Sequence, residues 1–206
     1  FPYTSLFRSV GKIVFLVAQA NLSGGDDHTR EMLTTLPAVT SRMSALIDDL
    51  LNLSRSKSTA LHLEPLDLSR MAGEIVRDLA VAEPYRVVQV EISSGIFAIA
   101  DEGLARVVLA NLLGNAWKYS AHAEAARIEF GTFLEGKESV FYVRDNGAGF
   151  DPRLKSRLFQ PFQRLHAQSD FAGTGIGLAT VARIIERHGG RIWADGKIGK
   201  GASFYL

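Results

Sequence analysis

The sequence has no cysteine, almost no excess of charge of either sign and no long apolar run. Without cysteine it has neither a disulfide framework nor a thiolate nucleophile, which suits a reducing compartment. Its 23 Lys and Arg residues nearly balance 22 Asp and Glu residues, which argues against a nucleic-acid partner held by a general basic field. The apolar run Ile13 to Ala18 is far shorter than the roughly 20 residues that cross a bilayer, so no membrane span is predicted. We expect a cytoplasmic chain, with any membrane attachment lying outside these residues.

The composition indicates a folded chain, because 47% of its 206 residues are hydrophobic. Predicted helices and strands follow one another without βαβ regularity. This predicts an α+β fold, a two-layer sandwich in which helices cover one face of a mixed, mostly antiparallel sheet, preceded by a helical segment. A boundary is expected near Glu64 and Pro65. Residues 1–60 then form a helical region, in which residues 1–25 are not assigned although GKIVFLVAQA is compatible with a helix, and residues 64–206 form a second domain.

A regular apolar seam runs through residues 26–56. Its members are spaced alternately four and three residues apart: Met32, Leu36, Val39, Met43, Leu46, Leu50 and Leu53. Heptad spacing predicts a helix that packs on a partner helix, from the same chain or from a second copy, and Ile47 and Leu51 widen the stripe as in a four-helix bundle. A helix lying on the core of its own domain is the alternative. Pro37 is expected to kink this helix or to mark its first turn.

The elements expected in the second domain alternate in short segments. Helices are predicted over 68–82, 101–119 and 174–188, and strands over 86–92, 96–100, 127–133, 137–144, 191–194 and 202–206. The stretch 55–66 is expected to be a polar connection.

The stretch Asp145 to Asp151, DNGAGFD, leaves the end of a predicted strand. A carboxylate at a strand end, beside backbone without side chains, is a common way to hold a polar ring. An Asn-Gly turn that only closes a hairpin is the alternative.

The helix predicted from Asp101 carries two carboxamides one turn apart, Asn111 and Asn115, on the face opposite its apolar residues. Amide oxygens can bind a hard cation, and Lys118 one turn later can meet an anion. A solvated polar face is the alternative. Tyr119 offers a ring at the same end.

A third stretch, Gly173 to Gly177, has the sequence GTGIG and enters a helix. Glycines at a helix N-terminus let backbone N–H groups approach phosphate oxygens. Neither the Walker nor the Rossmann pattern fits its context. Between this stretch and DNGAGFD, Phe159 and Phe162 flank Pro161 and are expected to anchor the base of a loop that closes over a ligand. Core residues under a surface loop are the alternative.

Taken together, ANLLGNAWKYS, DNGAGFD, LFQPFQRLH and GTGIGLAT resemble the N, G1, F and G2 boxes of sensor histidine kinases. The resemblance covers residues 66–206 and implies the Bergerat-type GHKL ATPase fold. The end of residues 26–56, RMSALIDDLLNLSR, resembles the second helix of the dimerisation and phosphotransfer domain. The resemblance further implies ATP and Mg²⁺ as ligands, a homodimer through residues 26–56 and a response regulator receiver domain as partner.

The resemblance also implies roles for individual residues. Asp145 would accept a hydrogen bond from the adenine amino group, and Asn115, with Asn111, would hold Mg²⁺. The nucleotide-binding residues that it implies are Asn111, Asn115, Lys118, Tyr119, Asp145, Gly147, Gly149, Arg164, Gly173, Thr174, Gly175, Ile176, Gly177 and Leu178. Related hydrolysing ATPases carry a glutamate where this chain has Asn111, and an amide cannot serve as a general base for water, which favours phosphoryl transfer.

The sequence departs from the family pattern at two points. Ala110 precedes the first N-box asparagine, where many members carry a polar residue. The family's phosphate-accepting histidine box is missing, and none of the five histidines is placed to replace it; His28 lies nearest the predicted bundle. We therefore expect a kinase catalytic region that binds ATP but does not phosphorylate itself. A dimerisation or nucleotide-binding module without kinase activity and a GHKL-type ATPase are the alternatives.

Overall fold

A computed structural model describes residues 60–163, 165, 171 and 174–206, all within one compact unit, residues 52–206. The expectations for residues 1–59, including the helix over 26–56 and His28, and those for Arg164 and Gly173, lie outside the described residues.

The described residues form a five-stranded sheet beside a small two-stranded one. The larger sheet has the order β2 (Val88–Ile92), β4 (Ala126–Glu135), β5 (Glu138–Asp145), β7 (Ala202–Tyr205) and β6 (Trp193–Gly196). Its β2–β4 pair is parallel and its other pairs are antiparallel. The small sheet pairs β1 (Glu64–Asp67) with β3 (Phe97–Ala100). The mixed, mostly antiparallel sheet predicted from the sequence is thereby confirmed.

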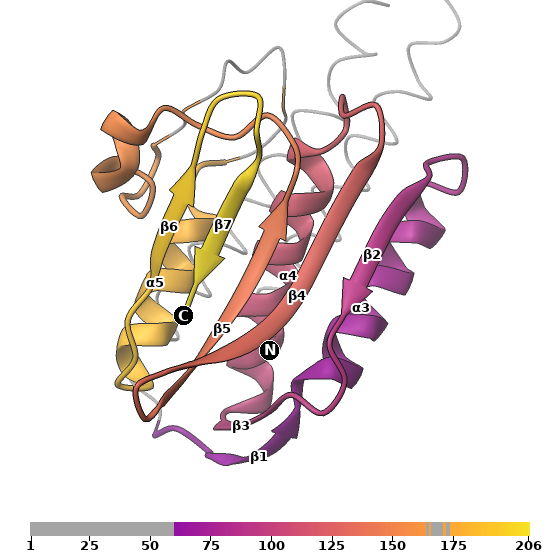
Figure 1. Cartoon of the computed structure of the whole chain (residues 1–206). Helices are drawn as coiled ribbons and strands as arrows, with labels where there is room; N and C mark the ends of the chain where they lie inside the picture. Colours follow the sequence, from indigo (N-terminus) through magenta and orange to yellow (C-terminus); the bar gives the residue numbers. More distant parts are fainter. Residues whose placement is uncertain (1–59, 164, 166–170, 172–173) are drawn as a thin grey trace, which may run out of the picture. The chain divides into compact units, whose positions relative to one another are not determined.

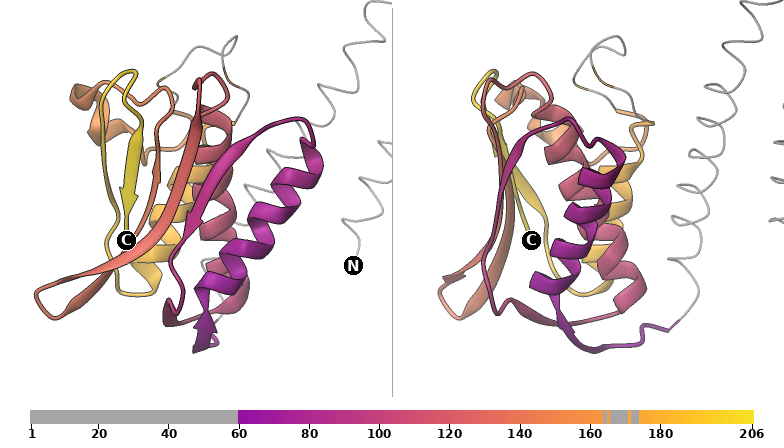
Figure 2. Two further views of the ribbon diagram at one scale, coloured as in Figure 1. Left: turned by 45° about the vertical axis from the view of Figure 1, so that its right-hand side comes forward. Right: turned by 90° about the vertical axis from the view of Figure 1, so that its right-hand side faces the viewer.

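Helices cover one face of the large sheet and leave the other face open (Figures 1 and 2). They are α3 (Leu68–Ala82), α4 (Glu102–Tyr119) and α5 (Gly177–Arg187). Carboxylates cap the first two, because Asp67 accepts from Arg70 N and Asp101 accepts from Leu104 N. The apolar face of α4 is fully buried at Leu112 and Leu113. The two-layer α+β arrangement is confirmed, and no helix among the described residues is both long and apolar enough to cross a membrane.

Two elements lie where the sequence predicted none. Strand β1 overlaps the end of the expected polar connection 55–66, since Pro65 is tolerated in a short edge strand. A 3-10 helix, η1 (Pro152–Arg157), follows the DNGAGFD stretch, and Asp151 caps it by accepting from Arg153 N. Helix α5 begins at Gly177 rather than at residue 174, so most of the glycine-rich stretch precedes the helix.

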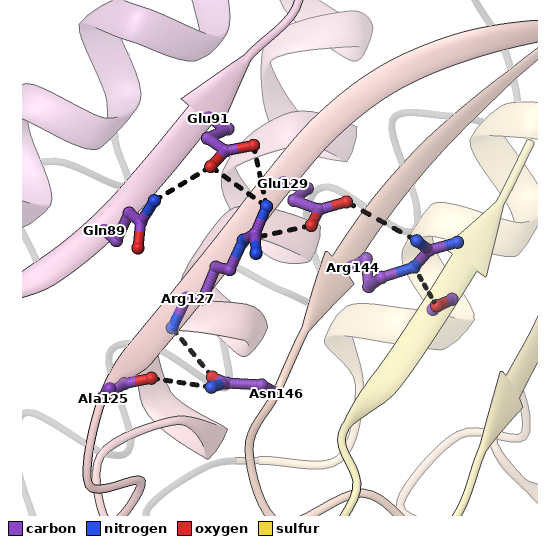
Figure 3. A network of polar contacts seen from close by, with 8 residues as sticks. Gln89, Glu91, Ala125, Arg127, Glu129, Arg144 and Asn146 are labelled. Atoms are coloured by element: carbon purple, nitrogen blue, oxygen red, sulfur yellow. Dashed lines mark hydrogen bonds and ion pairs between the residues drawn. The ribbon is translucent and has the colours of Figure 1, made fainter.

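The open face carries charged side chains that neutralise one another across neighbouring strands (Figure 3). Arg127 lies 3.0 Å from the carboxylate of Glu91 and 3.2 Å from that of Glu129. Arg144 lies 3.5 Å from Glu129 and donates to Ser203 Oγ at 3.0 Å. These pairs are substantially exposed, so each contributes little to stability and the row is a solvated surface.

Candidate functional site

Asp145, the last residue of β5, is a buried carboxylate at the end of a central strand. It is 5% exposed, and its Oδ1 accepts a hydrogen bond from Gly147 N at 2.8 Å. Burial raises the pKa of this carboxyl group to about 6, because hydrogen bonds from the backbone of Gly147 and Ala202 only partly offset the loss of hydration. Such a carboxylate is kept at a cost to stability, which points to a role in binding.

The next residue, Asn146, has a structural role. Its Oδ1 accepts from Arg127 N at 2.8 Å and its Nδ2 donates to Ala125 O at 2.7 Å (Figure 3). Asn146 thus ties the end of β5 to the start of β4, and this explains an asparagine beside the buried acid.

Gly147 lies against the last turn of α4. A Cβ atom built on Gly147 would lie 2.2 Å from Tyr119 O, so no side chain fits there. The same carbonyl oxygen accepts a hydrogen bond from Ala148 N at 3.0 Å. The turn after Asp145 is therefore held on the end of α4.

Gly149 is enclosed by the turn between β6 and β7. It has a φ of +61°, and a Cβ there would lie 2.0 Å from Lys197 O. Gly201, with a φ of +87°, leaves equally little room beside Asp145 O. Because both positions need the left-handed region and close backbone contact, only glycine fits them without strain.

These segments surround a hollow of about 500 Å³ that is partly open to solvent, here named the Asp145 hollow. It is lined by Tyr119, Asp145, Gly149, Phe150, Leu158, Gln163, Leu165, Leu178, Ala202 and Phe204. Its walls come from α4, β5, β7, α5 and the segments that join them. A mostly apolar hollow with one buried carboxylate is suited to a flat, largely apolar ring that carries a hydrogen-bond donor.

The polar face of α4 runs from the Asp145 hollow toward the start of α5. Asn111, Asn115 and Lys118 are half-buried on this face. Asn111 Nδ2 donates to Val107 O at 2.8 Å. Its Oδ1 lies so close to Gly177 that a Cβ on that glycine would be 2.2 Å away. Asn111 therefore fixes the approach of α5 to α4.

Lys118 and Tyr119 lie together at the C-terminal end of α4. Lys118 Nζ lies 4.2 Å from the centre of the Tyr119 ring, and Phe171 meets the same ring edge-on at 4.9 Å. The lysine places a positive charge over Tyr119, which lines the hollow.

The glycine-rich stretch before α5 packs on the segment after η1. Gly175 has a φ of +76°, and its carbonyl oxygen accepts from Phe162 N at 2.9 Å. Thr174 Oγ1 accepts from Ile176 N at 3.3 Å, and Ile176 is fully buried. Leu178 in the first turn of α5 reaches the Asp145 hollow. These contacts hold the residues before α5 against the segment that follows η1.

The two phenylalanines around Pro161 differ from the prediction. Phe159 packs against the core, but Phe162 is 63% exposed and has a φ of +62°. The expectation that both residues anchor this segment is wrong for Phe162, because its backbone turns into the left-handed region and directs the ring away from the core.

Several wall residues were not singled out from the sequence. They are Phe150, Leu158, Gln163, Leu165, Ala202 and Phe204. The first four lie within the DNGAGFD and LFQPFQRLH stretches, whose hollow-facing side chains were not named individually. Ala202 and Phe204 alternate with Ser203 and Tyr205 in β7 and so face the helices. In the described part of the chain, no cluster of three or more His, Cys, Asp or Glu side chains is placed to hold a metal ion.

A sheet with helices on one face, and a mostly apolar hollow that holds a buried acid, is an arrangement suited to binding a small ligand with a planar ring. Residues 100–206 match the family of histidine kinase-, DNA gyrase B- and HSP90-like ATPases, and the chain belongs to this family. The resemblance seen in the four motifs is confirmed.

The relatives of the chain are histidine kinases and phytochromes. It is 34% identical over 183 residues, 88% of its length, to cyanobacterial phytochrome A of Nostoc sp.. It is 35% identical over 161 residues, 78% of its length, to the methanogenesis regulatory histidine kinase FilI of Methanothrix harundinacea. The matches span 24% and 18% of these two relatives, so the chain corresponds to a minor part of each.

A solved structure shares the fold. Full-length ShkA in complex with AMPPNP superposes with a TM-score of 0.70 at 24% identity, over 98% of this chain and 43% of ShkA.

Proposed function

We propose that residues 64–206 are the ATP-binding catalytic domain of a two-component sensor histidine kinase, and that residues 1–60 belong to its dimerisation and phosphotransfer region. The observation that carries the proposal is the buried carboxylate of Asp145 in a mostly apolar hollow bounded by Gly149 and by Tyr119 at the end of α4. Family membership and the AMPPNP bound by ShkA support ATP as the ligand.

In this proposal the purine enters the Asp145 hollow. An ionised carboxylate is only an acceptor, so Asp145 selects a ring that presents an amino group, as adenine does, over one that presents a carbonyl, as guanine does. The apolar walls, among them Leu178 and Phe204, exclude water from the ring faces. Gly147 and Gly149 contribute by leaving the space that a side chain would fill.

The phosphates would lie along the polar face of α4 toward the start of α5. Lys118 supplies a positive charge, and the N-terminal end of α5, entered through Gly173, Thr174, Gly175 and Ile176, supplies backbone N–H groups. Arg164 completes the proposed set. Mg²⁺ is assigned to Asn115 with Asn111. Magnesium sites commonly combine one or two protein ligands with phosphate oxygens and water, so an amide pair suffices where the described residues offer no carboxylate cluster. The bound metal would neutralise charge on the phosphates.

Phosphoryl transfer is favoured over hydrolysis by the surroundings of Asn111. Its amide nitrogen is bonded to Val107 O and its oxygen packs on Gly177, and an amide has no basic pKa in the working range. No group at this position can therefore take a proton from an attacking water. We assign the phosphate-accepting histidine to the protein outside these 206 residues, and the onward acceptor to a response regulator receiver domain.

The whole protein would act as a cytoplasmic homodimer through residues 26–56, as its heptad seam suggests.

Radiolabelled ATP tests the transfer. The chain is incubated with ATP labelled at the γ-phosphate and Mg²⁺, and acid-labile label and released phosphate are measured separately. The proposal predicts neither self-labelling nor steady phosphate release. Acid-labile label on this chain would refute the missing acceptor, and steady release would favour a hydrolysing ATPase. A stable dimer with no detectable nucleotide binding would favour a dimerisation module.

A further inference from the structure

Arg86, in the connection between α3 and β2, points its guanidinium at the last turn of α4. Its side chain is only 15% exposed. Nη2 donates to the carbonyl oxygen of Trp117 and, at 3.0 Å, to Ser120 Oγ. The guanidinium carbon lies 5.0 Å from the centre of the Trp117 ring, and Nη1 lies 3.4 Å from Glu83. Because this largely buried cation makes several specific contacts, it is part of the packed structure and not a solvated surface charge.

The contacts of Arg86 fall where a helix most needs partners. The last carbonyl groups of an α-helix have no N–H partner within the helix, and that end carries a partial negative charge. Ser120 Oγ approaches Ala116 O at 2.7 Å and Trp117 O at 3.1 Å. Arg86 adds a positive charge to the same group of oxygens. The end of α4 is therefore fixed by a side chain that lies 31 positions away from Trp117 in the sequence.

The last turn of α4, which Arg86 contacts, also supports the turn that follows Asp145. Tyr119 O, between the two residues that Arg86 contacts, accepts from Ala148 N at 3.0 Å and closes the space at Gly147. Gly147 N in turn donates to Asp145 Oδ1 at 2.8 Å. A shift of the α4 terminus would move the loop and rotate the carboxylate.

We propose that Arg86 is a positioning residue for purine recognition, acting through the end of α4 and the Gly147 turn on Asp145. It does not itself line the Asp145 hollow. The inference rests on the proposed nucleotide site, but the link from Arg86 to Ala148 is a property of the free protein and is measurable without nucleotide.

The planar guanidinium is the group that this position requires. It contacts two oxygens while its carbon lies 5.0 Å from the centre of the indole ring, and a compact lysine ammonium does not reproduce this planar fork. Arg86→Lys is therefore expected to restore only part of what Arg86→Met removes. Arg191 provides a surface control, because it also lies over a tryptophan, Trp193 at 4.8 Å, and pairs with Glu135 at 2.7 Å, but its side chain is 67% exposed and does not line the Asp145 hollow.

Two measurements on the parent chain, Arg86→Met, Arg86→Lys and Arg191→Met test the proposal. Calorimetry gives the Kd for ATP and for GTP, and hydrogen exchange of the free protein gives the protection of the Ala148 amide. For Arg86→Met we expect an ATP Kd about 5- to 20-fold higher, the scale of coupling between contacting residues, and a smaller preference for ATP over GTP. We also expect faster exchange at Ala148 with β4 and β5 unchanged. Arg191→Met should stay within about twofold of the parent.

The outcomes separate the two proposals. If the parent binds no ATP, the nucleotide site is refuted, and exchange at Ala148 still decides whether Arg86 positions the loop. If the parent binds ATP while Arg86→Met keeps the parent's Kd and Ala148 protection, the positioning role is overturned. It is also overturned if ATP and GTP weaken equally while protection falls throughout the sheet, since that describes general destabilisation. Should Arg86→Met not fold, Arg86→Lys carries the same comparison.

Discussion

The domain contains two mostly apolar hollows whose polar groups differ. The Asp145 hollow, about 500 Å³ of space that is partly open to solvent, holds a buried carboxylate. A second hollow of about 660 Å³, here named the His188 hollow, lies between the small sheet, α4, α5 and the end of the chain. Its lining is apolar apart from His188 and the backbone, and includes Leu68, Ala98, Ile99, Val108, Phe141 and Ile184.

The polar groups of the two hollows differ in how fully hydrogen bonds within the fold satisfy them. In the His188 hollow, Asp101 N donates to His188 Nε2 at 3.2 Å, so the ring proton lies on Nδ1 and is donated to Ile184 O at 2.8 Å. Both ring nitrogens are thus used within the fold. Asp145 instead has its pKa raised to about 6 by burial. The size of a hollow therefore does not by itself indicate the candidate binding site. A buried charge whose lost hydration is only partly replaced by hydrogen bonds is the better indicator.

The largest expected effect comes from filling the backbone space beside Tyr119. Gly147→Ala would place a methyl group 2.2 Å from Tyr119 O and displace the turn that holds Asp145. ATP binding, measured by calorimetry, should weaken by about 100-fold or more, the scale of overpacking a rigid site. Gly73→Ala in α3 is the control, because a Cβ there meets nothing within 4 Å. It should leave binding unchanged and raise stability by about 0.5 to 1 kcal/mol.

Asp145→Asn should have the next largest effect. The amide can still accept from Gly147 N, but it presents a donor where the adenine amino group needs an acceptor. The loss is about 1.5 to 3 kcal/mol, or roughly 10- to 150-fold in the ATP Kd. Calorimetric titration measures the change, and an unaltered Kd would remove Asp145 from the recognition of the base.

The buried carboxyl group of Asp145 should also make the stability of the free protein depend on pH. Because burial raises the pKa of Asp145 to about 6 from 3.8, the folded state binds a proton more tightly than the unfolded state. Its contribution is fully present below about pH 3.8 and is lost as the pH rises through about 6, a change of about 3 kcal/mol. Urea unfolding of the parent and of Asp145→Asn between pH 4 and pH 7 measures it. The stability of the variant relative to the parent should increase with pH, and parallel curves would contradict the assignment.

The smallest effect is expected in the His188 hollow. Ala98→Val adds a β-branched side chain to β3 at the wall of this hollow. Stability should change by no more than about 1 kcal/mol, and the ATP Kd should stay within about twofold of the parent value. Thermal unfolding and calorimetry check both. A tenfold loss of ATP affinity would show that the two hollows are coupled. It would contradict the conclusion that the His188 hollow has no part in nucleotide binding.

The strand and helix order was predictable because the apolar periodicity is regular. Helix α3 spans Leu68–Ala82 as predicted, and Asp145 ends β5 next to the glycine-rich turn. Strand β1 was missed because a four-residue strand that includes Pro65 carries almost no local signal. Its pairing with β3 is a contact between segments far apart in the sequence.

The candidate site could be predicted only in part, because several of its contacts also join residues far apart in the sequence. The residues proposed to shape or contact the ligand site through a distinctive side chain or a glycine appear in motifs, as Asp145 and Gly147 do. Residues that act through another group do not. Neither the contact of Arg86 with the end of α4 nor that of Asn111 with Gly177 has a spacing that sequence periodicity could reveal.

A calorimetric titration of the parent chain with ATP and with GTP, each with and without Mg²⁺, tests the central assignment most directly. The buried acid predicts that ATP binds at least about tenfold more tightly than GTP, since guanine offers a carbonyl where Asp145 needs a donor, and losing a hydrogen bond to a charged group costs at least that much. The amide pair on α4 predicts that Mg²⁺ tightens the binding of ATP. Equal affinity for the two nucleotides, or no binding of either, would contradict the account.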